Sequence, residues 1–307
     1  MTNYKLKIFC LLASVLLFTG CKQDDYLGGH FTTDGQGVQA RIFAVSATEH
    51  ATPVVWTKGS QIALTSSYFD DSSLNRFYDC MEDGKSFSVH YGIPVYIKGS
   101  GLFVAYAPVA GNDGEETVIE LNTAKQQDIV DYVYAVESVS KEKEEVTFHF
   151  RHFHSRLHTA IKTADSEHIR KVILSGFSHS AFVNPATWEI SSLDTPSNYT
   201  IASETDISVF DLTLIPQVID SSSVMPVQMT FIGTNRYYEL TINKFTLESD
   251  KQLALEVDLS QPQPTLSFSL DGITWTNYED KMKNGVTFAC DSVVWTITDK
   301  GGDVTSN

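Results

Sequence analysis

Cysteine is scarce in this sequence, and its spacing excludes several kinds of site. The 307 residues include four cysteines, Cys10, Cys21, Cys80 and Cys290, and no Cys-x-x-Cys pair. A dithiol redox centre or a cysteine–histidine zinc site therefore lacks the ligand spacing that it needs. Cys80 and Cys290 either form one disulfide or, as we expect, stay separate, because isolated cysteines are most often buried as small apolar residues.

Positive charge is also in short supply. The chain has 22 lysine and arginine residues against 38 aspartate and glutamate residues, a formal net charge of −16. A surface this acidic repels nucleic acid and anionic lipid. We therefore expect no nucleic-acid partner, and any attachment to a membrane has to come from a covalent lipid.

Long hydrophobic runs are missing as well. Residues 8–18 form an almost unbroken apolar stretch after Lys5 and Lys7. A membrane-spanning helix needs about 20 apolar residues, whereas a basic start followed by a short apolar core is typical of a signal peptide. The sequence thus predicts a leader over residues 1–20.

A lipid attachment site follows this leader directly. Leu17-Phe18-Thr19-Gly20-Cys21 resembles a lipobox, which implies that Cys21 is acylated; the alternative is an ordinary cleaved leader beside a chance cysteine. The next residues resemble the acidic export signal that sends Bacteroidetes lipoproteins to the outer leaflet, or else form a solvated acidic linker: Lys22, Gln23, Asp24 and Asp25. We expect residues 21–37 to be a flexible acidic tether.

Catalytic and metal-binding motifs are absent from the sequence. The segment around Ser178 lacks the second glycine of a nucleophile elbow. Four histidines gather at positions 149, 152, 154 and 158, but no carboxylate or cysteine lies beside them in the sequence. We expect His149 and His158 to face solvent and His152 to be held by hydrogen bonds. The sequence predicts no enzyme, no metal site and no cofactor.

Short runs rich in β-branched and aromatic residues dominate what remains. They recur from residue 38 to residue 297, and glycine, asparagine, aspartate and proline separate them. Strands are expected, for example, over residues 102–106, 171–174 and 209–215, with none between the last two. Only residues 123–131 and 250–253 have a composition that favours helix. This spacing is typical of β-sandwiches, and the length suggests two domains. A change of alternation between Phe150 and Phe153 predicts a bulge or a bend where the strand crosses between sheets.

Several motifs in register resemble the fimbrillin family of the Bacteroidetes. They are Trp56-Thr-Lys-Gly-Ser-Gln-Ile62, Phe103-Val-Ala-Tyr106-Ala-Pro108, Asp131-Tyr-Val-Tyr-Ala135 after Gln127-Asp128, Phe150-x-His152-x-x-Ser155-x-Leu157, Val172-Ile-Leu-Ser-Gly176, Leu214-Ile-Pro216-Gln217 and Tyr237-Tyr-Glu-Leu240. The resemblance covers about residues 40–260. It implies an all-β chain of two tandem transthyretin-like β-sandwich domains, residues 38–165 and 166–307, after a lipoprotein signal peptide.

The resemblance also implies a mode of assembly. In the polymerising members an arginine-specific protease removes the first strand, and a strand from the next subunit fills the groove. This sequence has no arginine or lysine between residues 42 and 57, only His50, while Arg41 lies at the start of the first strand. We therefore expect a lipid-anchored anchor, tip or accessory subunit of a cell-surface fimbrium that keeps residues 38–48. Residues 286–298 are either a donor strand or the last core strand.

The rival hypothesis is a surface lipoprotein that binds glycans of host or bacterial surfaces. Trp188 and Trp275 lie beside predicted turns and are the candidates for stacking on sugars, whereas Trp56 and Trp295 lie in apolar runs and are expected in the core. Exposed tryptophans would favour glycan binding, and buried ones would favour the fimbrial role. The expected partners of a fimbrial subunit are other subunits by strand exchange and the outer membrane through Cys21.

Overall fold

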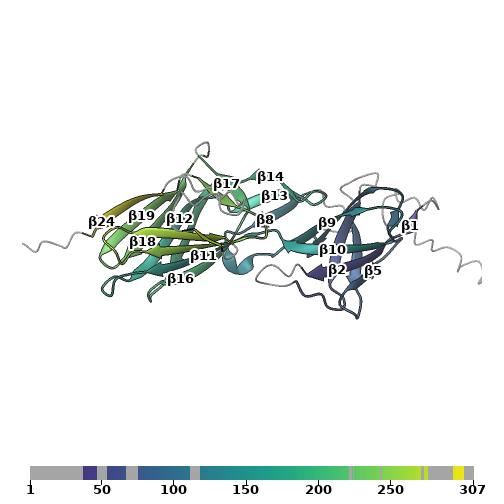
Figure 1. The fold of residues 1–307 in the computed structure, drawn as a ribbon, viewed down its shortest axis with the longest axis horizontal. Helices are drawn as coiled ribbons and strands as arrows, with labels where there is room; N and C mark the ends of the chain where they lie inside the picture. The colour runs from purple at the N-terminus through teal and green to yellow at the C-terminus, as the bar shows by residue number, and fades with distance from the viewer. Residues whose placement is uncertain are drawn as a thin grey trace, which may run out of the picture.

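The chain folds almost entirely into β-strands. The computed structural model describes residues 37–46, 54–66, 75–110, 118–220, 223, 225–242, 244–270, 273–275 and 293–300. The predicted leader and nearly all of the predicted tether lie outside them. Strands dominate the described part of the chain, which confirms the all-β prediction. Figure 1 shows an elongated molecule with one group of strands at each end.

The first group of strands closes into a barrel. Its order is β10-β2-β5-β4-β3-β7-β9, formed by Glu145–His152, Arg41–Ser46, Ser86–Val89, Arg76–Cys80, Gln61–Ser66, Gly101–Ala107 and Val133–Val139. A short pair, β1 (Val38–Gln39) and β6 (Tyr96–Ile97), lies beside it. Alternate residues of strands such as β4 are buried, and they fill the barrel with one apolar core.

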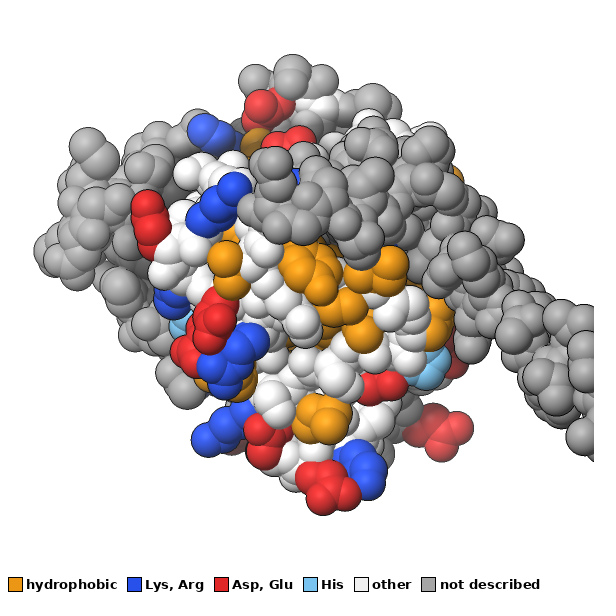
Figure 2. Space-filling model, turned by 90° about the vertical axis from the view of Figure 1, so that its right-hand side faces the viewer, with side chains coloured by type: hydrophobic (Ala, Val, Ile, Leu, Met, Phe, Trp, Pro, Cys, Tyr) orange, Lys and Arg blue, Asp and Glu red, His pale blue; other side chains and the backbone are white. Residues whose placement is uncertain are grey.

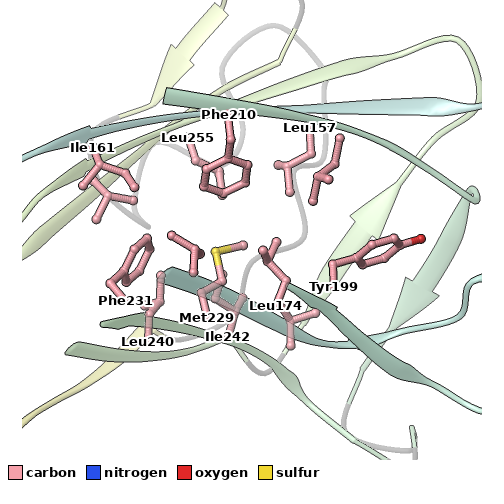
Figure 3. Packing of buried hydrophobic residues seen from close by; sticks show 14 of the residues in the cluster. Leu157, Ile161, Leu174, Tyr199, Phe210, Met229, Phe231, Leu240, Ile242 and Leu255 are labelled. Carbon is pink, nitrogen blue, oxygen red and sulfur yellow. The ribbon is translucent and has the colours of Figure 1, made fainter. Parts of the chain in front are cut away.

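The second group consists of two five-stranded sheets. One has the order β16-β11-β21-β22-β23, formed by Val209–Leu214, Ser155–Lys162, Gln252–Asp258, Thr265–Leu270 and Ile273–Trp275. The other has the order β15-β12-β18-β19-β24, formed by Ser197–Ala202, Ile169–Phe177, Val227–Gly233, Arg236–Ile242 and Val293–Asp299. Figure 3 shows Phe210 and Leu255 of one sheet facing Met229 and Leu240 of the other across a shared core.

A small three-stranded sheet combines a strand from the barrel part of the chain with two strands from the later part. It joins β8 (Ile119–Asn122), β13 (Ser180–Asn184) and β14 (Glu189–Leu193). The chain therefore leaves the barrel after β7, pairs β8 with β13 through the register Leu121↔Ala181, and returns to the barrel as β9. A two-stranded sheet of β17 (Gln217–Ile219) and β20 (Phe245–Leu247) and a 3-10 turn, η1 (Gln126–Asp128), complete the described elements.

The chain passes from the barrel to the two larger sheets at Phe153 and His154. β10 ends at His152, and β11 begins at Ser155 and pairs with β16 and β21. The predicted bend at this place is confirmed. β11 pairs with strands of the second group, although the sequence analysis assigned residues 38–165 to the first domain. The division of the chain into two domains stays a proposal.

Candidate assembly site

The first long strand, β2, is held on both edges within the barrel. It pairs with β10 in parallel from Arg41↔Glu145 to Ser46↔Phe150, and with β5 in antiparallel fashion through Ile42↔Phe87. Further backbone bonds run from the Ala44 amide to the Lys85 carbonyl (2.9 Å) and from the Arg41 amide to the Glu144 carbonyl (2.8 Å). β2 is therefore an interior strand, and no other described strand separates β10 from β5.

The side chains of β2 contribute to the barrel core. Ile42 and Ala44 are each 1% exposed and pack with Phe148 and Phe150 of β10. Burying an isoleucine of this kind is worth about 1.5–3 kcal/mol. Removing β2 would leave unpaired backbone groups on β10 and β5 and an apolar groove between them. A strand from another chain could fill this groove if it pairs with both edges and points apolar side chains into the core.

Arg41 fixes the start of β2 at the surface of the barrel. Its guanidinium lies 3.0 Å from the Glu145 carboxylate and 3.4 Å from that of Glu144, and its side chain is 55% exposed. Exposed pairs of this kind add little to stability. A cut after Arg41 would leave residues 42–46 in the barrel, because the chain beyond the cut still contains the buried Ile42 and Ala44.

At the other end of the molecule, β24 forms the edge of its sheet. It pairs with β19 over seven residues, from Ile242↔Val293 to Arg236↔Asp299. Trp295 packs partly against the core, with its ring 6.4 Å from that of Phe231, whereas Val294 and Ile297 are 54% and 37% exposed. The strand thus attaches mainly through its backbone ladder.

Most of the site residues that the sequence predicts cannot be examined in the described part of the chain. Cys21, Lys22, Gln23, Asp24 and Asp25 lie outside the described residues. The backbone of Trp275 ends β23, but its side chain is not part of the described structure. The lipidation and export predictions therefore stay predictions.

Trp188 is buried, which corrects its prediction as a sugar-stacking residue. It is 4% exposed and lies in the turn between β13 and β14, where its amide donates to the Asn184 carbonyl at 2.7 Å. Its φ is +57°, a conformation that bulky residues rarely adopt. Its ring stacks on Tyr134 at 5.3 Å and lies 5.2 Å from Tyr106, so the turn packs against the outside of the barrel.

The other tryptophans with described side chains are also packed. The Trp56 ring meets Phe150 at 4.9 Å and Phe87 at 5.4 Å, both near edge-on, and lies against the barrel core. Trp295 is half-buried, as described above. The prediction that Trp56 and Trp295 contribute to cores is confirmed.

The four histidines lie on β10, on β11 and at the bend between them, where the chain passes from the barrel to the larger sheets. His149 is exposed and lies 3.0 Å from Glu137, whereas His158 is half-buried and lies 2.8 Å from Asp211. At the bend, the carboxylate of Asp131 meets His152 at 2.9 Å and the buried His154 at 3.8 Å. Burial alone would raise the pKa of Asp131, but hydrogen bonds and the charges of both histidines lower it below its usual value.

Sequence reasoning missed Asp131 because it lies some twenty residues before its histidine partners. It also missed Asp250, whose carboxylate accepts from the His152 amide at 3.1 Å and whose own amide donates to the His154 carbonyl at 3.2 Å. Within the described parts of the chain, no three metal-ligating side chains come together. These residues hold the crossing between barrel and sheets in place.

Comparisons with known proteins agree with this architecture. The model of the fimbrillin-like family matches residues 41–273, most of the chain. The chain belongs to the fimbrillin-like family. Fimbrillin-like proteins are structural subunits of cell-surface fimbriae and not enzymes, so the fimbrial and non-enzymatic predictions are confirmed at that level.

Solved structures similar to this chain include proteins from Bacteroides and Porphyromonas species. A proposed cell adhesion protein of Bacteroides ovatus is 21% identical, with a TM-score of 0.52 over 76% of this chain and 96% of that one. Another from Bacteroides uniformis is 19% identical, with a TM-score of 0.51 over 79% and 99%. The tip fimbrial protein Mfa3 of Porphyromonas gingivalis is 9% identical, with a TM-score of 0.47 over 77% and 100%.

A search among curated proteins returned no match. None of the helices in the described residues is long and apolar enough to cross a membrane.

Proposed function

We propose that this fimbrial subunit is anchored in the outer membrane by lipid on Cys21 and occupies the anchor, tip or accessory position, where it keeps its own first strand. One observation carries the proposal. β2 fills the barrel between β10 and β5, and residues 42–57 offer no arginine or lysine at which a protease could release it. A filled barrel cannot accept a strand from a neighbour at this position, so a chain that keeps β2 ends a polymer or holds it to the surface.

Contact with other subunits is proposed at the two ends of the molecule. β24 is an edge strand with exposed apolar side chains, and an edge presents a row of unpaired backbone groups to another chain. We place strand exchange with a neighbouring subunit there. At the barrel end, Figure 2 shows apolar side chains gathered among interspersed acidic and basic ones, a mixture that suits contact with a second protein.

Replacing the lipid-bearing residue tests the anchor. The Cys21→Ala variant should leave the membrane fraction and incorporate no acyl label, because the acidic body has no other attraction to lipid. The matched control is Cys80→Ala, which changes a buried thiol and should stay membrane-bound and labelled. If Cys21→Ala remains on the membrane, the lipid anchor is wrong.

A further inference from the structure

The hairpin of β9 and β10 opens at its turn. The two strands pair through Val133↔His152 and Tyr134↔Arg151 only. Extending the same register would place Val139 opposite Val146, yet no pair is formed between the described residues 135–139 and 145–150. Hairpin strands are ordinarily paired up to their turn, and backbone groups left unpaired need water or a ligand.

A cleft occupies the place where the strands part. It has a volume of about 500 Å³, which is within the usual range for small-molecule sites. Its lining includes Ser138, Ser140 and Thr147, the charged side chains of Glu137 and Lys143, and His149. Val139 and Val146, which also line it, are buried core residues and give it an apolar floor.

Glu137 is the unusual residue of this cleft. Its neighbours on the same face of β9, Ala135 and Val139, are buried in the barrel core, and its partner on β7 is the fully buried Phe103. A carboxylate at such a position costs free energy unless it is paired. Its side chain is 28% exposed, and its Oε1 lies 3.0 Å from His149 Nδ1, a residue of the facing strand.

We propose that this cleft binds a short saccharide of one or two rings. The hydroxyl groups, the Glu137–His149 pair and the free backbone edges together offer both donors and acceptors to a polyhydroxylated ligand, and the valine floor suits the C–H face of a sugar ring. Because Lys143 and His149 accompany the carboxylates, the site favours a neutral ligand over a cation.

The shape of the cleft argues against an added peptide strand. The unpaired stretch of the hairpin ends at the paired residues 133–134 and 151–152 on one side and at the loop of residues 140–144 on the other, and Ser100 and Gly101 beside β9 also line the cleft. An extended chain could not run through an opening that is bounded on both sides, whereas a compact ring can enter it from the surface. The proposal goes beyond the fimbrial role, which makes no use of this cleft.

The test is saturation-transfer NMR on the purified full-length protein with glucose, galactose, mannose, N-acetylglucosamine, lactose and maltose. At least one sugar should bind saturably in the millimolar range. Glu137→Gln should weaken its binding about tenfold, because a charge-assisted hydrogen bond is lost. Thr147→Phe, which fills the cleft from a half-buried position on β10, should abolish the binding, and an unchanged Tm would show that the fold is intact. The control Glu120→Gln changes an exposed carboxylate on β8 and should bind as the wild type does.

Three results would overturn the proposal. They are the absence of saturable binding by all six sugars, sugar binding that survives Thr147→Phe, and saturable binding of a threonine–valine repeat peptide in place of a sugar.

Discussion

At the scale of single residues, the structure depends on a few side chains that join elements far apart in the sequence. Trp188 brings the β13–β14 turn onto Tyr134 of the barrel, and Asp131 joins the two histidines of the chain crossing. Both act between the barrel and the rest of the molecule. Substitutions there should therefore lower stability more than their surface counterparts do.

The Trp188→Ala variant should lose about 3–5 kcal/mol of unfolding free energy, because it removes a buried ring from a packed aromatic cluster. Urea denaturation measures the loss. The control Val55→Ala, at a side chain that is 74% exposed, should change stability by less than about 0.5 kcal/mol. A loss as small as that of the control would contradict the packing of the Trp188 ring in this cluster.

The Asp131→Asn variant should be less stable than the wild type near neutral pH, on the order of 1 kcal/mol after allowance for solvent screening. The pKa of Asp131 is lowered by folding, so its contribution is present above the unfolded pKa of about 4 and is lost as the pH falls through the folded value. Urea denaturation at about pH 7 and about pH 3 should show the difference shrinking at the acidic pH. Asp211→Asn, which breaks the exposed pair with His158, is the control and should change little; an equal effect at Asp131 and Asp211 would contradict the account.

These residues also mark what sequence could not predict at this scale. Trp188 follows Asn-Pro-Ala-Thr, a turn composition that suggested exposure, but the turn folds back onto the barrel and buries it. Asp131 and Glu137 lie on strands whose partners are set by tertiary packing. No local pattern indicates which histidine a distant carboxylate will meet.

At the scale of elements, strands with strong alternation were predicted well. The expected strand over residues 102–106 corresponds to β7, and that over 209–215 corresponds to β16. The predictions missed β13, β14 and β15, where serine, asparagine and exposed positions hide the period-two pattern. Within residues 123–131, which were expected to favour helix, only η1 is helical. Residues 250–253, also expected to favour helix, form a turn and the start of β21, because pairing of β21 with β11 outweighs the local helix propensity.

The element-scale prediction concerns β2. His50→Arg, at a position outside the described residues, should create a cleavable site beyond the strand. Digestion with an arginine-specific protease should then release β2, open the barrel between β10 and β5, and produce strand-exchanged oligomers on size-exclusion chromatography. Wild-type protein digested in the same way is the control: a cut after Arg41 leaves Ile42 and Ala44 in place, so it should stay monomeric. Equal oligomer formation by both proteins would show that β2 is not what closes the barrel to a partner.

At the scale of the whole molecule, a closed barrel and a two-sheet sandwich stand at opposite ends of an acidic chain (Figure 1). The motifs in register predicted this class of fold correctly, since they lie on strands of both groups. They could not predict that β8 leaves the barrel to pair with β13, because such a pairing depends on contacts between distant segments. The change of sheet at Phe153 and His154 was predictable, because the alternation of apolar residues changes phase there. The role that follows from the architecture depends on whether the mature protein keeps its first strand.

Mass spectrometry of the N-terminus of the protein purified from cells tests that claim most directly. We predict that the first residue is an acylated Cys21 and that peptides covering residues 38–48 are present. The reason is that residues 42–57 contain no arginine or lysine and that β2 is integral to the barrel. A mature protein that begins beyond residue 48, carries no lipid and forms detergent-resistant multimers would contradict the account and identify a polymerising stalk subunit.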